Sequence, residues 1–253
     1  MAVVAAATAV VLAACQPNGP SAAPSRDGQG NAQRTAQQNA ATPANASGAP
    51  AGAPTAGRAR PRVVFIGTSL TAGLGLDPDS AYPALVARKA DSAGTPITVV
   101  NAGVSGETSA GALRRADWVL GDAADVIVIE TGANDGLRGQ SPDSLRANLE
   151  RLVARARALQ PRARVALVQM EAPRNFGAAY TARFRDVYPA VARSTGAPLF
   201  PFLLDGVAGV PRLNQPDGIH PNEEGARRVA DNVWRALAPL LAAPAAPVAA
   251  TSP

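Results

Sequence analysis

The sequence of 253 residues is poor in residue types that carry chemistry in many other proteins. It contains one cysteine, Cys15, and one histidine, His220. A single cysteine excludes an intramolecular disulfide, and one histidine with one cysteine cannot build a recognisable zinc site. The sequence also has no clustered acidic loop of the kind that binds a hard cation. We therefore expect neither a metal nor another cofactor.

Lysine is almost absent too, since Lys89 is the only one and arginine carries nearly all the positive charge. The net charge is +5, of which residues 1–60 hold +3, so the remainder of the chain carries only +2. A nearly neutral body gives no electrostatic reason to bind nucleic acid. We expect no nucleic-acid partner.

An uncharged apolar run, AVVAAATAVVLAA, occupies residues 2–14. It is too short to span a bilayer as a helix but suits the core of a signal peptide. The run ends in LAAC, which resembles the lipobox of bacterial lipoproteins and predicts a lipid anchor at Cys15. No Lys or Arg precedes the run, so secretion without an anchor and a chance match are the alternatives. In the first two cases we expect a cell-envelope, periplasmic or secreted protein.

Three further segments follow residues 1–15. Residues 16–60 are mainly Ala, Pro, Gly, Ser, Asn and Gln with almost no large apolar side chain, which predicts a disordered tether. Residues 242–253 have the same composition and predict a disordered tail. Hydrophobic residues make up 47% of the chain, enough for one core. We expect one catalytic domain at residues 61–241.

Within that domain, short β-rich runs alternate with longer amphipathic stretches. The predicted strands lie at residues 62–66, 97–101, 125–130, 164–170 and 198–200. The predicted helices lie at residues 82–92, 108–120, 141–159, 180–194 and 222–240. The runs VVFI and VIVI are continuously apolar, as in strands covered on both faces. The pattern predicts an α/β fold, a three-layer α/β/α sandwich with a mainly parallel five-stranded sheet.

In such sheets the reactive groups gather at the carboxyl ends of the strands. The turn GTSLTAG at residues 67–73 follows the first strand and would present Ser69 there as a nucleophile. The turn differs from the G-x-S-x-G elbow of α/β-hydrolases, because Thr71 stands two residues after the serine. A serine that merely caps a helix is the alternative interpretation.

Two later loops offer groups that could bind a developing negative charge. After the second strand, NAGVSGET includes Gly106, where the backbone can approach a ligand closely and point an N–H into a cleft. After the third strand, TGANDG includes Asn134, whose side-chain amide can donate to an oxyanion. An ordinary strand-to-helix loop and a Gly-Asn turn are the alternatives.

The segment DGIHPN precedes the last predicted helix and places Asp217 three residues before His220. A histidine can act as a general base, and a neighbouring carboxylate can orient its ring. A structural histidine and a plain Asx turn are the alternatives.

Together the four loops resemble the GDSL family, also called the SGNH hydrolases. The first block corresponds to GTSL at residues 67–70, the second to Gly106, the third to GAND at residues 132–135 and the last to DGIH at residues 217–220. The resemblance covers residues 62–240 and implies the flavodoxin-like fold of that family.

The segments GANDGLRG, QMEAP and NFG resemble a subgroup of bacterial arylesterases and multifunctional acyl-thioesterase/lysophospholipases. One departure is Thr68, which stands where the family usually has an aspartate before the nucleophile. The resemblance implies that the side chain at this position supports the turn and does not take part in the chemistry. We therefore expect activity to survive, with an altered stability of the loop.

The resemblance implies a serine esterase that forms an acyl-enzyme. Ser69 would attack the acyl carbon, His220 would be its base, and Asp217 would hold the imidazole. The backbone N–H groups of Ser69 and Gly106, with the side chain of Asn134, would form the oxyanion hole.

The implied substrate is a small-molecule or lipid acyl ester, with thioesters and lysophospholipids as further candidates. The resembling subgroup predicts that Leu137, Pro173 and Phe176 line the acyl pocket. A polysaccharide O-deacetylase of the same family is one alternative. A non-catalytic lipoprotein that binds an acyl chain or glycan is another. We expect a monomer.

Overall fold

The computed structural model describes residues 60–243. The predicted signal peptide at residues 1–15, with Cys15, lies outside the described residues. So do residues 16–59 of the predicted tether and residues 244–253 of the predicted tail.

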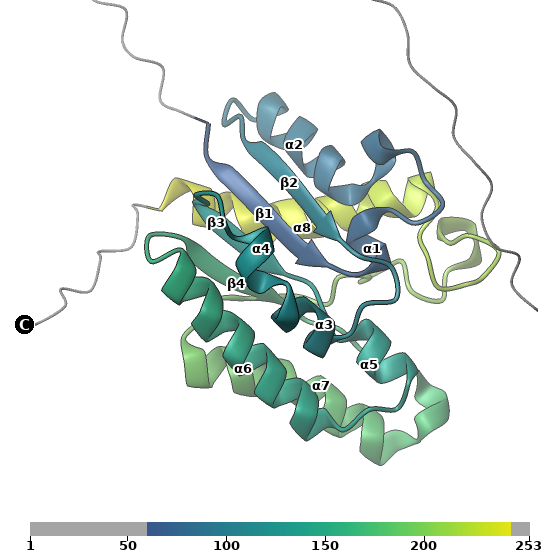
Figure 1. Ribbon diagram of the computed structural model, residues 1–253. Coiled ribbons are helices and arrows are strands. Elements are labelled where there is room, and N and C mark those ends of the chain that lie inside the picture. Colours follow the sequence, from purple (N-terminus) through teal and green to yellow (C-terminus); the bar gives the residue numbers. More distant parts are fainter. Residues whose placement is uncertain (1–59, 244–253) are drawn as a thin grey trace, which may run out of the picture. The chain divides into compact units, whose positions relative to one another are not determined.

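One five-stranded sheet forms the centre of the described chain, in the order β2-β1-β3-β4-β5 (Figure 1). The strands are β1 (Arg62–Gly67), β2 (Thr98–Gly103), β3 (Val126–Ile129), β4 (Arg164–Val168) and β5 (Leu199–Phe200). All four pairings are parallel. The apolar runs in β1 and β3 are buried, as strands covered on both faces must be. The predicted fold class is confirmed.

Helices cover both faces of the sheet. Helices α2 (Tyr82–Ser92) and α8 (Glu223–Ala242) pack together on one face, and α6 (Pro142–Leu159) and α7 (Ala178–Thr195) pack together on the other (Figure 1). Helix α6 begins at a Ser141 cap with a proline in its first turn, and it buries apolar residues at helical spacing. Within residues 60–243 no helix is long and apolar enough to cross a bilayer.

The prediction of a single helix at residues 108–120 is wrong. The structure has two short helices there, α3 (Ser109–Arg114) and α4 (Ala116–Val119), which meet at Arg115. The guanidinium of Arg115 forms an ion pair with Glu107 at 2.6 Å and donates to the carbonyl of Ala102 at 2.7 Å. The backbone at Arg115 has φ −98° and ψ 3°, outside the helical range. We attribute the break to this anchoring, which sequence periodicity does not reveal.

No bounds were predicted for the short elements at the carboxyl ends of the strands. They are α1 (Ser69–Ala72) after β1, α5 (Ala133–Leu137) after β3, η2 (Arg174–Phe176) after β4 and η3 (Pro211–Leu213) after β5; a further short turn, η1 (Pro78–Ser80), precedes α2. Each is too short to show a hydrophobic period. The first three of the strand-end elements hold the candidate residues Ser69, Asn134, Leu137 and Phe176.

Candidate active site

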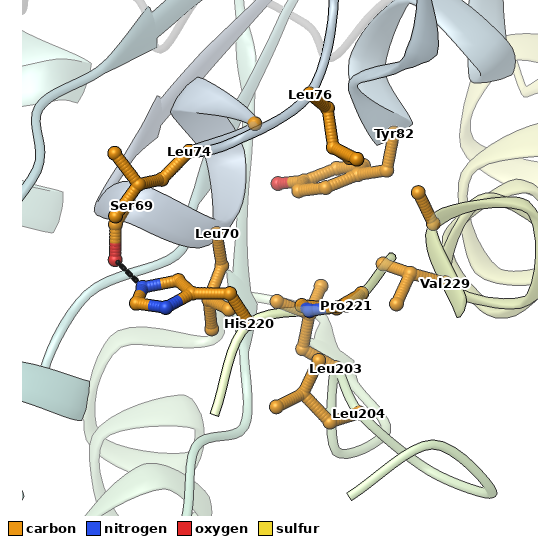
Figure 2. A pocket seen from close by; sticks show the side chains of 12 residues that line it. Ser69, Leu70, Leu74, Leu76, Tyr82, Leu203, Leu204, His220, Pro221 and Val229 are labelled. Carbon is orange, nitrogen blue, oxygen red and sulfur yellow. Dashed lines mark hydrogen bonds between the residues drawn. The ribbon is translucent and has the colours of Figure 1, made fainter. Parts of the chain in front are cut away.

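Ser69 is the first residue of α1 and follows β1 after a single residue, Thr68. Thr68 caps α1 with its side chain, and a left-handed Gly73 ends the helix. The hydroxyl oxygen of Ser69 lies 2.8 Å from Nε2 of His220 (Figure 2). The two residues are 151 positions apart, so the fold brings together the pair that the sequence predicted as nucleophile and base.

His220 is held from its other side by Asp217. Oδ2 of Asp217 lies 2.6 Å from Nδ1 of His220. Oδ1 accepts the backbone N–H groups of Ile219 at 2.9 Å and His220 at 3.0 Å. The hydrogen bond from the His220 side chain, followed by the two backbone donors, lowers the pKa of Asp217 to about 2. The ionised carboxylate can only accept a hydrogen bond, so the ring proton lies on Nδ1 and the lone pair of Nε2 faces the Ser69 hydroxyl.

The predicted oxyanion donors lie on the three loops that follow β1, β2 and β3. Within residues 60–243, the backbone N–H groups of Ser69 and Gly106 have no hydrogen-bond acceptor. Gly106 has φ +76°, a conformation that favours glycine. The amide of Asn134 donates to the carbonyl of Glu107 at 3.0 Å, which fixes its orientation and leaves its second N–H for a ligand.

A buried carboxylate that was not predicted from the sequence lies next to the turn that carries Ser69. Glu130 directly follows β3 and has no exposed surface. It accepts hydrogen bonds from the Thr68 backbone at 2.9 Å and from the Thr71 hydroxyl at 2.7 Å, and Thr71 in turn contacts the hydroxyl of Tyr82 at 2.8 Å. Burial raises the pKa of Glu130 to about 7, although these donors oppose the rise. A charged residue directly after the apolar run VIVI is the signal that would have found it.

A small apolar pocket opens beside the Ser69–His220 pair (Figure 2). Its walls include Leu74, Leu76 and Val229, and its volume of about 10 Å³ holds about one water molecule. An acyl chain therefore needs more room than this pocket provides as it stands. In the described part of the chain, no three His, Cys, Asp or Glu side chains are placed to hold a metal ion.

The residues predicted to line the acyl pocket lie elsewhere at the same edge of the sheet. Leu137 ends α5, and Pro173 directly precedes η2, which ends at Phe176. The aromatic rings of Phe176 and Tyr180 are 5.4 Å apart, and the Phe176 side chain is partly exposed. None of the three predicted residues lines the pocket beside Ser69. Their role in binding acyl chains stays a prediction.

A serine, a histidine and an aspartate joined in this order at the carboxyl edge of a parallel sheet are typical of serine hydrolases. Comparisons with known proteins agree with that class. The model of the GDSL-like lipase/acylhydrolase family matches residues 65–228. The chain therefore belongs to the GDSL-like lipase/acylhydrolase family and is a carboxylic ester hydrolase. The family predicted from the four loops is confirmed.

The similar proteins cover nearly the same share of the chain. Esterase TesA of Pseudomonas aeruginosa is 42% identical over 180 residues, which are 71% of this chain and 89% of that protein. The arylesterase of Vibrio mimicus is 32% identical and covers 72% of this chain and 90% of its own length. Thioesterase 1/protease 1/lysophospholipase L1 of Escherichia coli is 34% identical, and the match covers 71% of this chain and 84% of that protein.

Solved structures show the same similarity in three dimensions. The crystal structure of TesA has a TM-score of 0.67 at 41% identity and covers 71% of this chain and 99% of its own. The psychrotrophic esterase EstA from Pseudoalteromonas sp. has a TM-score of 0.68 at 33% identity, and the match covers 71% of this chain and 98% of that chain. Both are esterases by name, which agrees with the class of this protein.

Proposed function

We propose that this protein is a serine esterase that works through the triad Ser69, His220 and Asp217. The observation that carries the proposal is the unbroken chain of hydrogen bonds from the Ser69 hydroxyl through His220 to Asp217. Both distances lie within the range needed for direct proton transfer. A protein that only binds acyl chains would not need this arrangement, so it favours hydrolysis over the non-catalytic alternative.

In the first half of the reaction Ser69 attacks the acyl carbon while Nε2 of His220 takes its proton. The imidazolium then gives that proton to the leaving alkoxide, and an acyl group remains on Ser69. Asp217 keeps the tautomer in place and stabilises the charged ring. In the second half, water attacks the acyl-enzyme, with His220 again as base, and releases the carboxylic acid.

The negative oxygen of each tetrahedral intermediate would lie among three donors. These are the backbone N–H groups of Ser69 and Gly106, which find no acceptor among the described residues, and the second N–H of the Asn134 amide. Donors that are already oriented stabilise the charge without reorganising during the reaction. The contact of Asn134 with the Glu107 carbonyl provides that orientation.

The proposed substrates are carboxylic esters of acyl chains, and the names of the relatives extend them to thioesters and lysophospholipids. We place the acyl chain on the side of Leu137, Pro173 and Phe176, where two of these apolar side chains, Leu137 and Phe176, are exposed at the carboxyl edge of the sheet. An apolar chain would cover that surface on binding.

We also propose that the protein acts in the cell envelope, because the apolar run before Cys15 has the composition of an export signal. A lipid at Cys15 would then hold the catalytic domain near the membrane. Mass spectrometry of the mature N-terminus tests this directly. A diacylglyceryl mass on Cys15 is the expected result, and an unmodified cysteine in the mature protein would rule out the anchor.

The triad is tested by His220→Ala and Ser69→Ala, with hydrolysis of p-nitrophenyl esters as the assay. Removing either residue should lower kcat by about 10³-fold or more. A fluorophosphonate probe should label the wild type on Ser69 and leave Ser69→Ala unlabelled. Substantial activity in a purified Ser69→Ala sample, or labelling at another serine, would overturn the assignment.

A further inference from the structure

The two catalytic side chains come from separate parts of the chain. Residues 69–75, here the nucleophile segment, carry Ser69, and residues 214–221, here the histidine loop, carry His220. Among the described residues, two hydrogen bonds join these segments. One is the Ser69–His220 contact, and the other runs from the side chain of Gln215 to the backbone carbonyl of Leu74.

Gln215 bridges the two segments with a single amide group. Its Nε2 donates to the carbonyl of Leu74 at 2.7 Å and to the carbonyl of Pro221, next to His220, at 2.9 Å. Its backbone N–H donates to the carbonyl of His220 at 2.7 Å. One residue therefore contacts the backbone on both sides of the active-site gap.

The nucleophile segment is shaped to receive this side chain. Gly75 has φ +78°, and a Cβ added there would lie 2.2 Å from Oε1 of Gln215. No other residue type would fit that position without displacing the glutamine. The amide thus packs directly on the backbone that continues from the Ser69 helix.

Only one of the two connections can persist through a catalytic cycle. The Ser69–His220 hydrogen bond is lost whenever Ser69 carries an acyl group, so it cannot hold the segments at a constant distance. The contacts of Gln215 involve no reacting atom and stay in place. We propose that Gln215 is a positioning residue that keeps His220 within proton-transfer distance of Ser69; the inference rests on the proposed triad.

The chain offers a matched control in Gln160. Its Nε2 also donates to two backbone carbonyls, those of Leu120 at 2.7 Å and Asp122 at 3.0 Å. Gln160 lies between α6 and β4, at the amino end of the strands and so at the edge opposite the active site. Replacing either glutamine removes the same kind of bridge, but only one bridge touches the catalytic segments.

The experiment compares Gln215→Leu with Gln160→Leu in the full protein. For Gln215→Leu we expect kcat to fall by about 10- to 100-fold with KM within about twofold, because misplacing a catalytic group by about 1 Å costs this much. The rate of inactivation by a p-nitrophenyl phosphonate should fall by the same factor. For Gln160→Leu, kcat should stay within about twofold of the wild type. This difference in kcat is expected even if both substitutions lower the melting temperature. Equal kcat values for the two variants would overturn the proposal.

Gln215→Glu keeps the shape of the side chain and tests the donor itself. At pH 8 a carboxylate would face the carbonyl oxygens of Leu74 and Pro221, so kcat should fall at least as far as in the leucine variant. The ratio of variant to wild-type kcat should rise toward pH 5.5, where a protonated carboxyl can donate one hydrogen bond. Wild-type kcat at pH 8 would contradict the proposal, even if Gln215→Leu did not fold. Activity retained in Ser69→Ala would instead refute the proposed triad. A failure of the triad can therefore be told apart from a failure of the role proposed for Gln215.

Discussion

The hydroxyl of Thr68 lies 3.1 Å from each carboxylate oxygen of Glu130, and the backbone N–H of Thr68 donates to the same carboxylate at 2.9 Å. The residue before Ser69 is therefore joined by hydrogen bonds to the residue that follows β3. An aspartate here would place a second carboxyl group beside a buried one, whereas threonine supplies a donor. Thr68 thus supports the turn before Ser69 through its hydrogen bonds with Glu130.

The first prediction concerns the stability of the fold as a function of pH. The pKa of Glu130 rises from 4.5 to about 7 on folding, so between these values the folded protein holds a proton that the unfolded chain releases. The stabilisation is complete below pH 4.5 and is lost as the pH rises through 7. The free energy of unfolding of the wild type, minus that of Glu130→Gln, should therefore fall by about 3 kcal/mol from pH 4.5 to pH 8. Urea titrations across this range measure it.

Glu171→Gln controls for the loss of one negative charge, since Glu171 is exposed. The difference between the two variants therefore isolates the effect of burying the carboxylate from the effect of removing one charge. A Glu130→Gln stability curve parallel to that of the wild type would mean that Glu130 does not titrate differently in the folded and unfolded states.

The second prediction concerns Thr68. Thr68→Val removes a donor to the buried Glu130 and the acceptor for the backbone N–H of Leu70. We expect a loss of about 1–3 kcal/mol in the free energy of unfolding at pH 8, because a buried carboxylate loses a partner. Thr68→Ser keeps the hydroxyl and should lose much less. Equal stability of the valine and serine variants in urea would show that the hydroxyl contributes nothing.

The third prediction concerns Asn134 and the oxyanion. Asn134→Ala removes the side-chain donor while leaving the triad intact. We expect kcat to fall by about 10²- to 10³-fold with little change in KM, because the lost interaction strengthens only in the transition state. Steady-state kinetics with a p-nitrophenyl ester measure both constants. A change confined to KM would place Asn134 in ground-state binding instead.

The fourth prediction concerns Phe176 and the length of the acyl chain. Phe176→Ala should change the order of kcat/KM along a series of p-nitrophenyl esters from acetate to decanoate, because it removes an exposed aromatic wall. Trp118→Ala removes another exposed aromatic residue, on α4, and should leave the order as it is. If both variants kept the wild-type order, the acyl chain would have to bind elsewhere.

The extent of prediction from sequence differs between local and long-range features. The apolar runs of β1 and β3 and the period of α6 predicted the layers, because burial imposes those patterns directly. Ser69 and His220 were identifiable because each stands in a short loop with distinctive neighbours. Their 2.8 Å contact depends on strand order, which no local pattern encodes.

The features that escaped prediction depend on contacts between distant segments. Glu130 is an isolated glutamate in the sequence, and its partner Thr68 lies 62 residues away. The Gln215 side chain reaches Leu74 across 141 positions. Arg115 interrupts a helical pattern through its contact with the carbonyl of Ala102, on a neighbouring strand. In each case the fold brings together partners that no local pattern in the sequence pairs, although the charge of Glu130 after an apolar run is itself a local signal.

Asp217 and His220 lie on one short turn, three residues apart and joined by both side-chain and backbone hydrogen bonds. These hydrogen bonds hold His220 and Asp217 in a fixed arrangement relative to each other. Loop insertions or deletions upstream of Asp217 would move the pair toward or away from the serine without separating its two members. Changes in the length of this one loop can therefore alter the distance from Ser69 to the proposed base, while the geometry between His220 and Asp217 stays the same.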